Sequence, residues 1–436
     1  MPARKARIDA PLVATNAVLS GAAPWALPLA LRAVLMQPDG WRHLPQRFGF
    51  LPRISAPQRG RIWLHAAGPG EVTGAAPVIR ALLARRPGAD LVVSSYEEPG
   101  LRMAQRLFPD ARARFFLPFD FLPLVRLAVA RVRPTLCVLM ETELWPNFLW
   151  TLARRGVPVA VINGQISDTA FRRARRFRGF YRWMLGHLAI TCAQSAEEAE
   201  RFCALGQPAD RLLTVGSVKF DGLQQPNETV RERLREDLQL RADEPLLVAG
   251  STHAGEEVLV LAAFTVLRRR IPGLRVLIAP RDRTRAGDVA ALTARASYSV
   301  CRRSAPQPGV AVVVLDTMGE LASAFGLGAV GFVGGSLVPV GGHNLLEPLA
   351  WGRPVVFGPH VQSFKEIADA VLAAGLGRQV SSAPALTKAL AAYFESPELL
   401  SEVAARAPEF LRRHAGATER TVAALLPLLA NGVVAR

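Results

Sequence analysis

The stretch "RIWLHAAGPGEVTGAAPVIRALLARRPGADLVVSSY", Arg61–Tyr96, alternates two kinds of pattern. "RIWLHA" is a short apolar run of the kind that forms a buried strand, and "GEVTGAAPVIRALLARRP" has the spacing of a helix. "ADLVVSSY" then repeats the strand pattern. A strand, a helix and a second strand in this order predict a βαβ unit of a parallel sheet.

The same alternation continues along most of the chain. "TLCVLM", "VPVAVING" and "LAITCAQS" follow in the first half, and "PLLVAGS", "LRVLIAP", "VAVVVLD", "GAVGFVGGS" and "RPVVFGPH" in the second. The polar run "QQPNETVRERLREDLQLRADE", Gln224–Glu244, separates the two halves and is typical of a connector. We therefore predict two doubly wound α/β domains. The expected boundaries are an anchor at 1–36, a first domain at 37–220, a linker at 221–244 and a second domain at 245–436.

Composition narrows the kind of partner. The chain has 436 residues, half of them hydrophobic, which suits two domains with sizeable cores. Its formal net charge of +17 favours an anionic partner such as a membrane surface or a phosphorylated substrate. The chain lacks the basic motifs interleaved with aromatic residues that are typical of RNA-binding modules, so we do not expect nucleic acid as a partner. The four cysteines show no CxxC spacing and indicate neither a zinc site nor a disulfide framework.

The N-terminus contains a long uncharged segment. "APLVATNAVLSGAAPWALPLAL", Ala10–Leu31, is flanked by basic residues and is long for the apolar part of a cleaved signal peptide. Pro11, Pro24 and Pro28 weaken its interpretation as a spanning helix. We expect a membrane anchor that either spans the bilayer or lies in its interface, with basic flanks facing anionic lipid.

Charged residues follow several strands of the predicted first domain. Glu71 comes behind a Gly-Pro-Gly turn that opens a helix, either as a first-turn glutamate favoured by the helix dipole or as a site residue. Glu141 and Glu143 leave a very apolar strand, where charge is costly without a partner, so a site is the better interpretation. Lys219 in "GSVKFD" is one of very few lysines, although a solvated surface lysine is the simpler interpretation. Ligands of such sheets bind at the carboxyl ends of strands, where most of these residues fall.

Polar motifs also follow the strands of the second domain. "GSTHAGEE", Gly250–Glu257, is either a plain capped helix start or an anion site built from free N–H groups. Arg281 in "IAPRD" stands at a strand end, where it can pair with phosphate. "LDTMGEL" ends a strand and opens a helix at Met318–Glu320.

The run "GGSLVPVGGHNLLEP", Gly334–Pro348, breaks an apolar strand with paired glycines. It is either a buried strand, turn and core helix, or a ligand site. In the second case the glycines let the backbone approach a ligand closely. Asn344 and Glu347 are about one helical turn apart, and we expect them to share a helical face.

The order and spacing of these motifs resemble those of the Kdo transferase family. Its members are glycosyltransferases that move 3-deoxy-D-manno-octulosonic acid (Kdo) from CMP-Kdo onto a lipid A precursor. The resemblance covers nearly the whole chain and includes "LPQRFGF", "METELWPN", "GSVKFD", "STHAGEE", "DTMGEL" and "GGSLVPVGGHNLLEP". It implies the GT-B fold, in which two Rossmann-like domains face a central cleft. The first would take the lipid acceptor and the second the nucleotide sugar.

The resemblance also implies roles for particular residues. Glu71 is the general base, Glu141 stabilises an oxocarbenium-like transition state, and Lys219 offsets charge on the departing CMP phosphate. No metal and no cofactor are implied, since the leaving group has one phosphate and the chain has no DxD-type pair. The expected location is the cytoplasmic face of the inner membrane, on anionic lipid. The implied CMP-binding residues are Pro280, Arg281, Met318, Gly319, Glu320, Asn344, Leu345, Leu346 and Glu347.

Several positions depart from the family pattern, mostly on the acceptor side. The family commonly has Ser at Gly68, Arg at Gln165, Arg-Ser at Thr169–Ala170 and Tyr at Ala174. The acceptor, and the number of Kdo residues added, are therefore less defined than the donor.

Two other functions stay open beside transfer of Kdo to lipid IVA. One is a divergent paralogue that uses another CMP-ulosonic acid or another acceptor. The other is a catalytically silent membrane scaffold of the same fold. Retention of Glu71, Glu141 and Lys219 argues against the scaffold.

Overall fold

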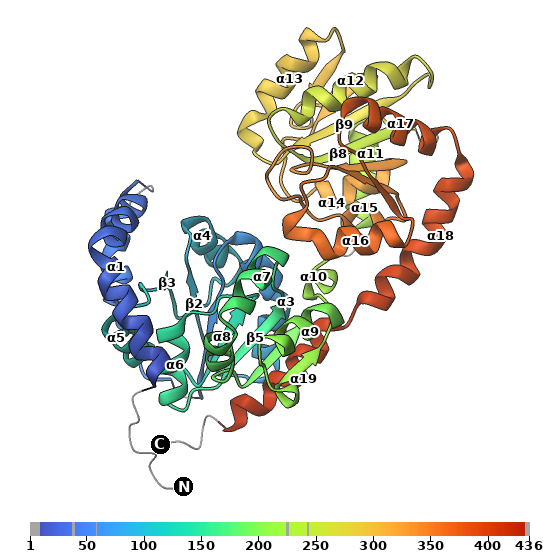
Figure 1. The fold of residues 1–436 in the computed structure, drawn as a ribbon. Coiled ribbons are helices and arrows are strands. Elements are labelled where there is room, and N and C mark those ends of the chain that lie inside the picture. Colours follow the sequence, from blue (N-terminus) through green and yellow to red (C-terminus); the bar gives the residue numbers. More distant parts are fainter. Residues whose placement is uncertain (1–8, 37–39, 58, 224–225, 242–243, 432–436) are drawn as a thin grey trace. The chain divides into compact units, whose positions relative to one another are not determined.

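The structure, a computed structural model, describes residues 9–36, 40–57, 59–223, 226–241 and 244–431 (Figure 1). The chain divides into two compact units. One unit contains the chain up to Gly222 together with the C-terminal part from Ala415, and the other is Leu223–His414.

The first unit is built on a seven-stranded sheet whose strand pairs are all parallel. The strand order is β3-β2-β1-β4-β5-β6-β7. The chain winds outward from β1 to β3 and then returns to place β4 beside β1, so the point where the winding reverses lies between β1 and β4. The strands are β1 (Arg61–His65), β2 (Asp90–Ser95), β3 (Ala113–Phe116), β4 (Leu136–Met140), β5 (Val159–Gly164), β6 (Ile190–Ala193) and β7 (Leu212–Thr214).

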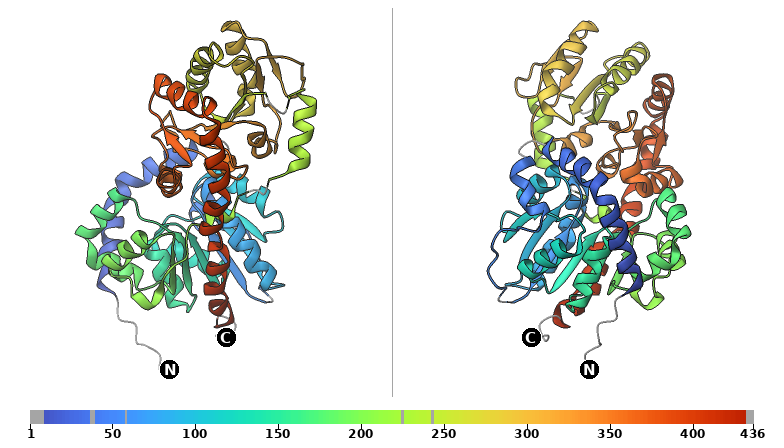
Figure 2. Two further views of the ribbon diagram at one scale, coloured as in Figure 1. Left: turned by 90° about the vertical axis from the view of Figure 1, so that its right-hand side faces the viewer. Right: turned by 60° about the vertical axis from the view of Figure 1, so that its left-hand side comes forward.

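Helices cover both faces of this sheet (Figures 1 and 2). The helices of the first unit are α1 (Ala10–Leu35), α2 (Gly40–Arg47), α3 (Pro69–Arg85), α4 (Glu98–Leu107), α5 (Leu122–Val132), α6 (Pro146–Arg154), α7 (Asp168–Arg176), α8 (Arg178–Leu185), α9 (Ala196–Ala204), α10 (Val218–Asp221) and α19 (Ala417–Asn431), with a 3₁₀ turn at Ala209–Arg211.

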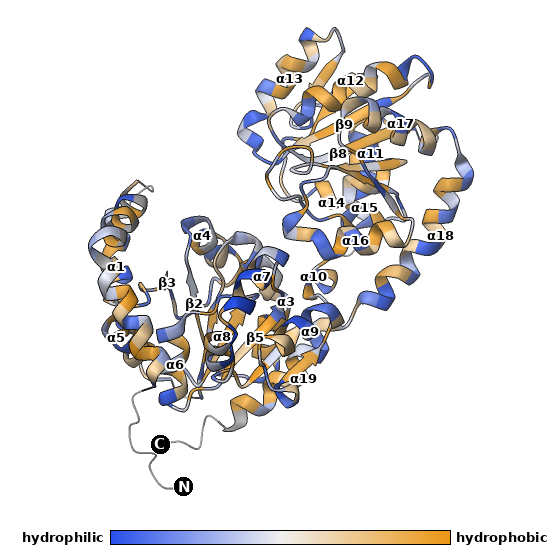
Figure 3. Cartoon of the chain, in the orientation of Figure 1, coloured by the Kyte–Doolittle hydropathy of each residue, from blue (hydrophilic) through white to orange (hydrophobic). Residues whose placement is uncertain are grey.

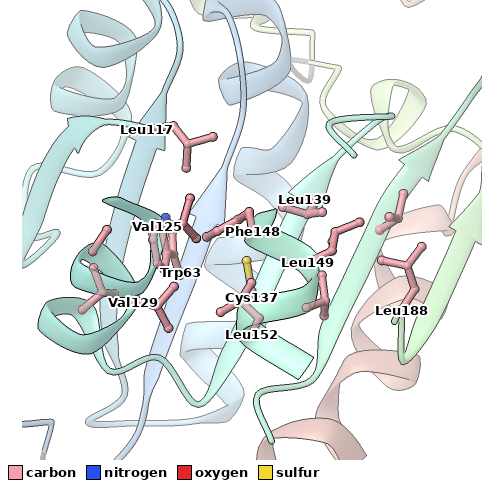
Figure 4. Close-up of a cluster of buried hydrophobic side chains, with 14 of the residues drawn as sticks. Trp63, Leu117, Val125, Val129, Cys137, Leu139, Phe148, Leu149, Leu152 and Leu188 are labelled. Atoms are coloured by element: carbon pink, nitrogen blue, oxygen red, sulfur yellow. The ribbon is translucent and has the colours of Figure 1, made fainter. Parts of the chain in front are cut away.

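Successive side chains of β1 enter two separate cores, as the period of two of a strand requires. Trp63 points to one face, where its ring lies 4.8 Å from that of Phe148 among the residues of α5, α6 and α8 (Figure 4). Ile62 and Leu64 point to the other face and pack with α3 and α19. The sheet is therefore buried on both sides, which explains why its strands are almost uniformly apolar.

The second unit repeats this plan with another seven-stranded parallel sheet, of order β10-β11-β9-β8-β12-β13-β14. Here the winding reverses between β8 and β12. The strands are β8 (Leu246–Thr252), β9 (Arg275–Pro280), β10 (Val300–Arg302), β11 (Val312–Val314), β12 (Val330–Val333), β13 (Val355–Phe357) and β14 (Gly377–Gln379).

One face of the second sheet packs on α12, α13 and α17 around Phe264. The helices of this unit are α11 (Glu228–Asp237), α12 (Glu256–Arg268), α13 (Ala286–Arg295), α14 (Leu321–Ala324), α15 (Leu346–Leu349), α16 (Lys365–Ala373), α17 (Ala383–Phe394) and α18 (Pro397–His414), with 3₁₀ turns at Arg283–Arg285, Phe325–Leu327 and Gln362–Phe364. The α/β class and the two parallel sheets predicted from the sequence are confirmed.

The division of the chain differs from the predicted boundaries at two places. The predicted linker, 221–244, contains α11, whose Leu234 is buried and whose Asp237 accepts a 2.6 Å bond from Arg303 of the second unit. The predicted second domain, 245–436, ends with α19, which belongs to the first unit. Its start is held there by Asp221, which accepts hydrogen bonds from the N–H groups of Gly416 (2.7 Å) and Thr418 (2.5 Å).

Helix α1 contains the predicted anchor segment and is attached to the first unit. The Asn16 amide donates to Asn147 Oδ1 of α6 at 2.7 Å, and the Trp150 indole donates to Asp9 at 2.8 Å. Trp25 and Leu29 remain exposed. Figure 3 shows apolar stretches along α1. By length and hydropathy, none of the helices in the described part of the chain qualifies as a membrane span.

Candidate active site

Glu71 and Glu141 follow the two strands between which the winding of the first sheet reverses. Glu71 is in the first turn of α3, which starts after β1, and its Oε2 accepts the Ala67 N–H at 2.7 Å. Glu141 directly follows β4. Parallel neighbours end at the same edge of a sheet, so both carboxylates are placed at the usual ligand position of this fold.

The surroundings of Glu71 disfavour its charged form. Burial raises the pKa of the carboxyl group to about 8, and the negative charges of Glu141 and Glu143 add to the increase. The Ala67 N–H and the Lys219 charge oppose it. A carboxyl group with a pKa near neutrality is suited to exchange protons with a substrate.

Glu141 has an unusual backbone conformation and a charged partner. Its φ is +61°, in the left-handed region that few residues other than glycine adopt. Its N–H donates to the Ile162 carbonyl at 2.9 Å, and its Oε1 lies 3.0 Å from Lys219 Nζ. The two side chains are 18% and 16% exposed, so this ion pair is partly shielded from water.

Lys219 is held by residues that the sequence analysis did not identify. Asn163, at the end of β5, accepts hydrogen bonds through Oδ1 from Ser217 Oγ (3.2 Å) and the Val218 N–H (3.1 Å). Gly74 of α3 leaves space for Met140 at the end of β4, since a Cβ there would lie 2.8 Å from Met140 Cε, whereas Lys219 Cε would be at an ordinary contact distance of 4.0 Å. The asparagine fixes the turn that carries Lys219, and the glycine lets Met140, which precedes Glu141, pack against α3.

Glu143 is paired with a buried histidine that the sequence analysis also missed. His65 Nε2 lies 3.5 Å from Glu143 Oε2, and the Trp145 indole donates to the same oxygen at 3.0 Å. Burial alone would raise the pKa of Glu143, but the hydrogen bond and charge of His65, with Trp145, lower it. His65 stands at the end of β1, shortly before Glu71 in the sequence. This position at a strand end is the sequence signal that could have identified it as a site residue.

The predicted CMP-binding residues are gathered in the second unit, near the carboxyl ends of its strands. Pro280 ends β9, and Arg281 is exposed directly after it. Met318 is exposed and Gly319 has a φ of +80°, while Glu320 pairs with Arg303 at 3.3 Å. β11, which precedes Met318, is the neighbour of β9 in the sheet.

One prediction about the last CMP-binding segment is wrong. Helix α15 begins at Leu346, and Asn344 precedes it, accepting the Leu346 N–H at 3.1 Å. Asn344 and Glu347 therefore do not share a helical face. Leu345 and Leu346 are fully buried, which leaves their backbone as the part available to a ligand. Burial raises the pKa of Glu347 to about 7, against the opposing charge of Arg281.

The glycines of this region are required by the packing of the protein itself. A Cβ on Gly334 would lie 2.6 Å from the Ser251 carbonyl oxygen and 2.7 Å from Glu256 Oε2. Gly335 has a φ of +65°, and a Cβ there would lie 2.9 Å from the ring of His343. The space that we expected a nucleotide to need at these two glycines is filled by neighbouring protein atoms.

Glu256, at the start of α12, joins the loops that follow β8 and β12. Its Oε2 accepts the N–H groups of His253 (2.9 Å) and Gly335 (2.7 Å), and its Oε1 accepts those of Ser336 (3.0 Å) and Leu337 (2.8 Å). The side chain is fully buried. Four backbone donors on one carboxylate compensate for the cost of burying its charge and fix the two loops together. Within the described residues, no group of three or more His, Cys, Asp or Glu side chains is arranged to hold a metal ion.

Two doubly wound parallel sheets of this kind define a two-domain α/β protein with a GT-B-like fold. A solved structure of this fold is UDP-GlcNAc 2-epimerase from Neisseria meningitidis, with a TM-score of 0.58 and 14% identity over 84% of this chain and 100% of that one.

The sequence comparisons identify the family within that class. The family described as 3-deoxy-D-manno-octulosonic-acid transferase (kdotransferase) matches residues 42–222. The chain is 32% identical to 3-deoxy-D-manno-octulosonic acid transferase of Haemophilus influenzae, over 90% of this chain and 92% of that protein. It is 34% identical to the transferase of the same name from Bordetella pertussis, over 87% of this chain and 90% of that protein. The chain belongs to the 3-deoxy-D-manno-octulosonic acid transferase family and is a glycosyltransferase.

Proposed function

We propose that this enzyme transfers Kdo from CMP-Kdo to a lipid A precursor, lipid IVA, with Glu71 as the general base. The observation that carries the proposal is the grouping of Glu71, Glu141 and Lys219 where the winding of the first sheet reverses, with the pKa of Glu71 raised to about 8. Family membership supports the transferred sugar.

Glu71 has the properties that deprotonation of an acceptor hydroxyl requires. As the hydroxyl oxygen attacks the anomeric carbon of Kdo, its proton passes to the carboxylate. A base with a pKa of about 8 is mostly protonated at pH 7 and becomes ionised as the pH rises. Transfer should therefore become faster with rising pH until about pH 8.

The ion pair of Glu141 and Lys219 is suited to a transition state that separates charge. Positive charge develops on the sugar, where a carboxylate is favourable, and negative charge develops on the departing phosphate, where an ammonium group is favourable. The 3.0 Å pairing holds both groups in place before the reaction begins, which lowers the cost of orienting them.

The donor is assigned to the second unit. Arg281 is exposed at the end of β9 and is a suitable partner for the nucleotide phosphate. Glu347 lies close enough for the Arg281 charge to act on it, and a glutamate is a suitable acceptor for ribose hydroxyls.

The direct test is an assay of purified full-length protein with CMP-Kdo and lipid IVA, with products identified by mass spectrometry. A product heavier than lipid IVA by one or more Kdo units supports the proposal, and the mass also gives the number of units added. Product from another CMP-ulosonic acid or acceptor, but not from this pair, would favour the divergent paralogue. Absence of transfer from every donor would favour the silent scaffold.

We further propose that the enzyme works on the cytoplasmic face of the inner membrane, with α1 lying in the lipid interface. The exposed apolar side chains Val18, Trp25, Leu29 and Met36 recur at intervals of seven, four and seven residues, which puts them on one side of the helix. A stripe of exposed apolar side chains that includes a tryptophan is suited to contact with a lipid interface.

The basic segment "FRRARRFRGFYRW", Phe171–Trp183, interleaves arginines with aromatic residues, and this pattern predicts a surface on which several rings and arginines meet lipid headgroups. Phe171, Phe180, Tyr181 and Trp183 pack against the core of the first unit, and Phe177 is the exposed ring, at 66%. The expectation of several aromatic side chains facing headgroups is therefore wrong. Exposed arginines dominate the surface of α7, and anionic lipid attracts such a surface.

Vesicle sedimentation tests the two parts of this surface separately. Trp25→Ser with Leu29→Ser should reduce binding to anionic vesicles, while Val13→Ser, exposed on α1 but away from the stripe, should not. Charge reversal at Arg172, Arg173, Arg175 and Arg176 should remove most of the remaining binding at low salt, where charges are least screened. Equal binding of all variants, or equal binding to neutral and anionic vesicles, would contradict the proposed docking.

A further inference from the structure

Two histidines at the reversal point of the second sheet face each other directly. His253 follows β8, and His343 lies beyond β12 in the glycine-rich run. Their Nε2 atoms are 2.8 Å apart, and the ring planes differ by 7°. At this distance one Nε2 carries a proton and donates it to the other, whose own proton is then on Nδ1.

The fold holds this pair in place from both sides. The carboxylate of Glu256 binds the His253 N–H and the Gly335 N–H through a single oxygen. Gly335 has room for the ring of His343 because it has no Cβ, and the Gly342 N–H donates to the Gly335 carbonyl at 2.8 Å to close the loop that carries this histidine. The two imidazoles are thus fixed by buried backbone contacts.

The charged groups around the pair keep it neutral in the free protein. Burial lowers the pKa of His343 to about 3, and the charge of Arg281 adds to the decrease. Burial also lowers the pKa of His253, where Glu256 and Glu257 act against Arg281 and Arg285. Because the two rings share one hydrogen bond between Nε2 atoms, the pair has room for one additional proton but not for two.

The reaction generates a charge that such a pair can match. The phosphate of CMP-Kdo links the nucleoside to the sugar and carries one negative charge. When the bond to the anomeric carbon breaks, both of its electrons stay on the phosphate oxygen, and CMP leaves with a second negative charge.

We propose that the His253–His343 pair takes up one proton when CMP is bound beside Arg281, and that the resulting imidazolium stabilises the second negative charge of the leaving nucleotide. The proton comes from solvent, and the imidazolium stays hydrogen-bonded to its neutral neighbour. This inference rests on the assignment of the second unit as the CMP site. It adds His253 and His343 to that site as charge-compensating residues.

Calorimetric titration of full-length protein with CMP tests the proposal. At about pH 7.5 free CMP is almost entirely a dianion, since the second pKa of a phosphate monoester is about 6. Binding is measured in three buffers of different ionisation enthalpy, and the slope of observed against buffer enthalpy gives the protons taken up. We expect wild type to take up as much as about one proton more per CMP than His343→Asn, in which Glu347, with a pKa of about 7, still takes up part of a proton. His43→Gln, a histidine of the first unit, is the control and should behave as wild type.

The outcomes separate this inference from the donor assignment. If CMP does not bind wild-type protein, the donor assignment fails and the inference fails with it. If CMP binds without proton uptake, or if His343→Asn takes up as many protons as wild type, the inference alone is overturned.

Nuclear magnetic resonance of ¹⁵N-histidine-labelled wild type provides a second readout that does not depend on a variant folding. The free protein should show two neutral imidazoles of opposite tautomer, and the CMP complex should show one imidazolium. Two neutral rings in the complex would overturn the proposal.

Discussion

Glu71 has neighbours whose charges act on its carboxyl group in opposite directions. Burial is the largest influence on its pKa, Glu141 raises it further, and Lys219 lowers it. Glu141 and Lys219 also lie 3.0 Å apart, so removal of either changes two interactions together. The sign of each change can be predicted because each partner carries a known charge.

Single substitutions in this pair should move the pH profile of transfer in opposite directions. Glu141→Gln removes a negative charge and should shift the acid limb of kcat/KM to lower pH, since the pKa of Glu71 falls. Lys219→Met removes a positive charge and should shift that limb to higher pH. Both variants should also be slower, by roughly 10²-fold or more, as for lost transition-state stabilisation. Shifts in the same direction would contradict the proposed role of Glu71 as the titrating base.

Glu71 should also reduce the stability of the protein at alkaline pH. The pKa of Glu71 in the folded protein is about 8, above its ordinary value of 4.5. Between these two pH values the folded protein therefore keeps a proton on Glu71 that the unfolded chain has lost. With respect to this group, the free energy of unfolding is highest below about pH 4.5, and this contribution is lost as the pH rises through about 8. The melting temperature of Glu71→Gln should therefore rise relative to wild type between pH 5 and 8.5, measured by circular dichroism. Glu402→Gln, at an exposed site on α18, controls for the loss of one carboxylate. A difference in melting temperature between Glu71→Gln and wild type that stays constant across pH would contradict the proposed effect of the buried Glu71 charge.

At the scale of elements, the loops after β8, β12 and β13 are joined by short backbone contacts. Ser336 Oγ accepts the Gly358 N–H at 2.8 Å, and the Ser336 carbonyl accepts the His360 N–H at 2.9 Å. With the four bonds of Glu256, these contacts fix the loops without large side chains. The glycine content of the region follows from this close approach.

Gly358→Ala should therefore destabilise the second unit. The added Cβ would lie 2.1 Å from the Ser336 carbonyl oxygen, so the loop must move. We expect a loss of about 1–3 kcal/mol in the free energy of unfolding, measured with denaturant. Gly287→Ala is the matched control, since a Cβ there meets nothing within 4 Å and the residue lies in α13; it should stabilise by about 0.5–1 kcal/mol. A neutral Gly358→Ala would show that the loops are not tightly coupled.

At the scale of the whole molecule, the chain leaves the first unit and returns to it at its end. Val422, Leu425 and Leu429 of α19 lie in the same core as Ile62 and Leu64 of β1. The last helix is thus part of the unit that contains the predicted catalytic residues, although its sequence follows the second unit.

Leu425→Ala should weaken the first unit and leave the second unchanged. Truncation of a fully buried leucine costs about 2–5 kcal/mol. Hydrogen exchange should show faster exchange in β1 and β4 and unchanged protection in β8 and β9. Loss of protection confined to the second unit would contradict this division of the chain.

Alternating apolar runs were sufficient to predict both sheets, because fully buried parallel strands have a distinctive composition. The positions of Glu71, Glu141 and Arg281 at strand ends were predictable for the same reason. Asn163 and Glu256 were not, because their roles depend on contacts between segments distant in sequence, and His65 was missed although it also stands at a strand end. The return of α19 was missed because an amphipathic helix does not indicate which sheet it covers.

We propose above all that Glu71 removes the acceptor proton in a Kdo transfer from CMP-Kdo. The most direct measurement compares wild type and Glu71→Gln in single-turnover formation of Kdo–lipid IVA, with CMP affinity measured on the same preparations. We expect transfer to be roughly 10²–10⁴-fold slower in Glu71→Gln, with CMP affinity unchanged. Transfer by Glu71→Gln at close to the wild-type rate would contradict it.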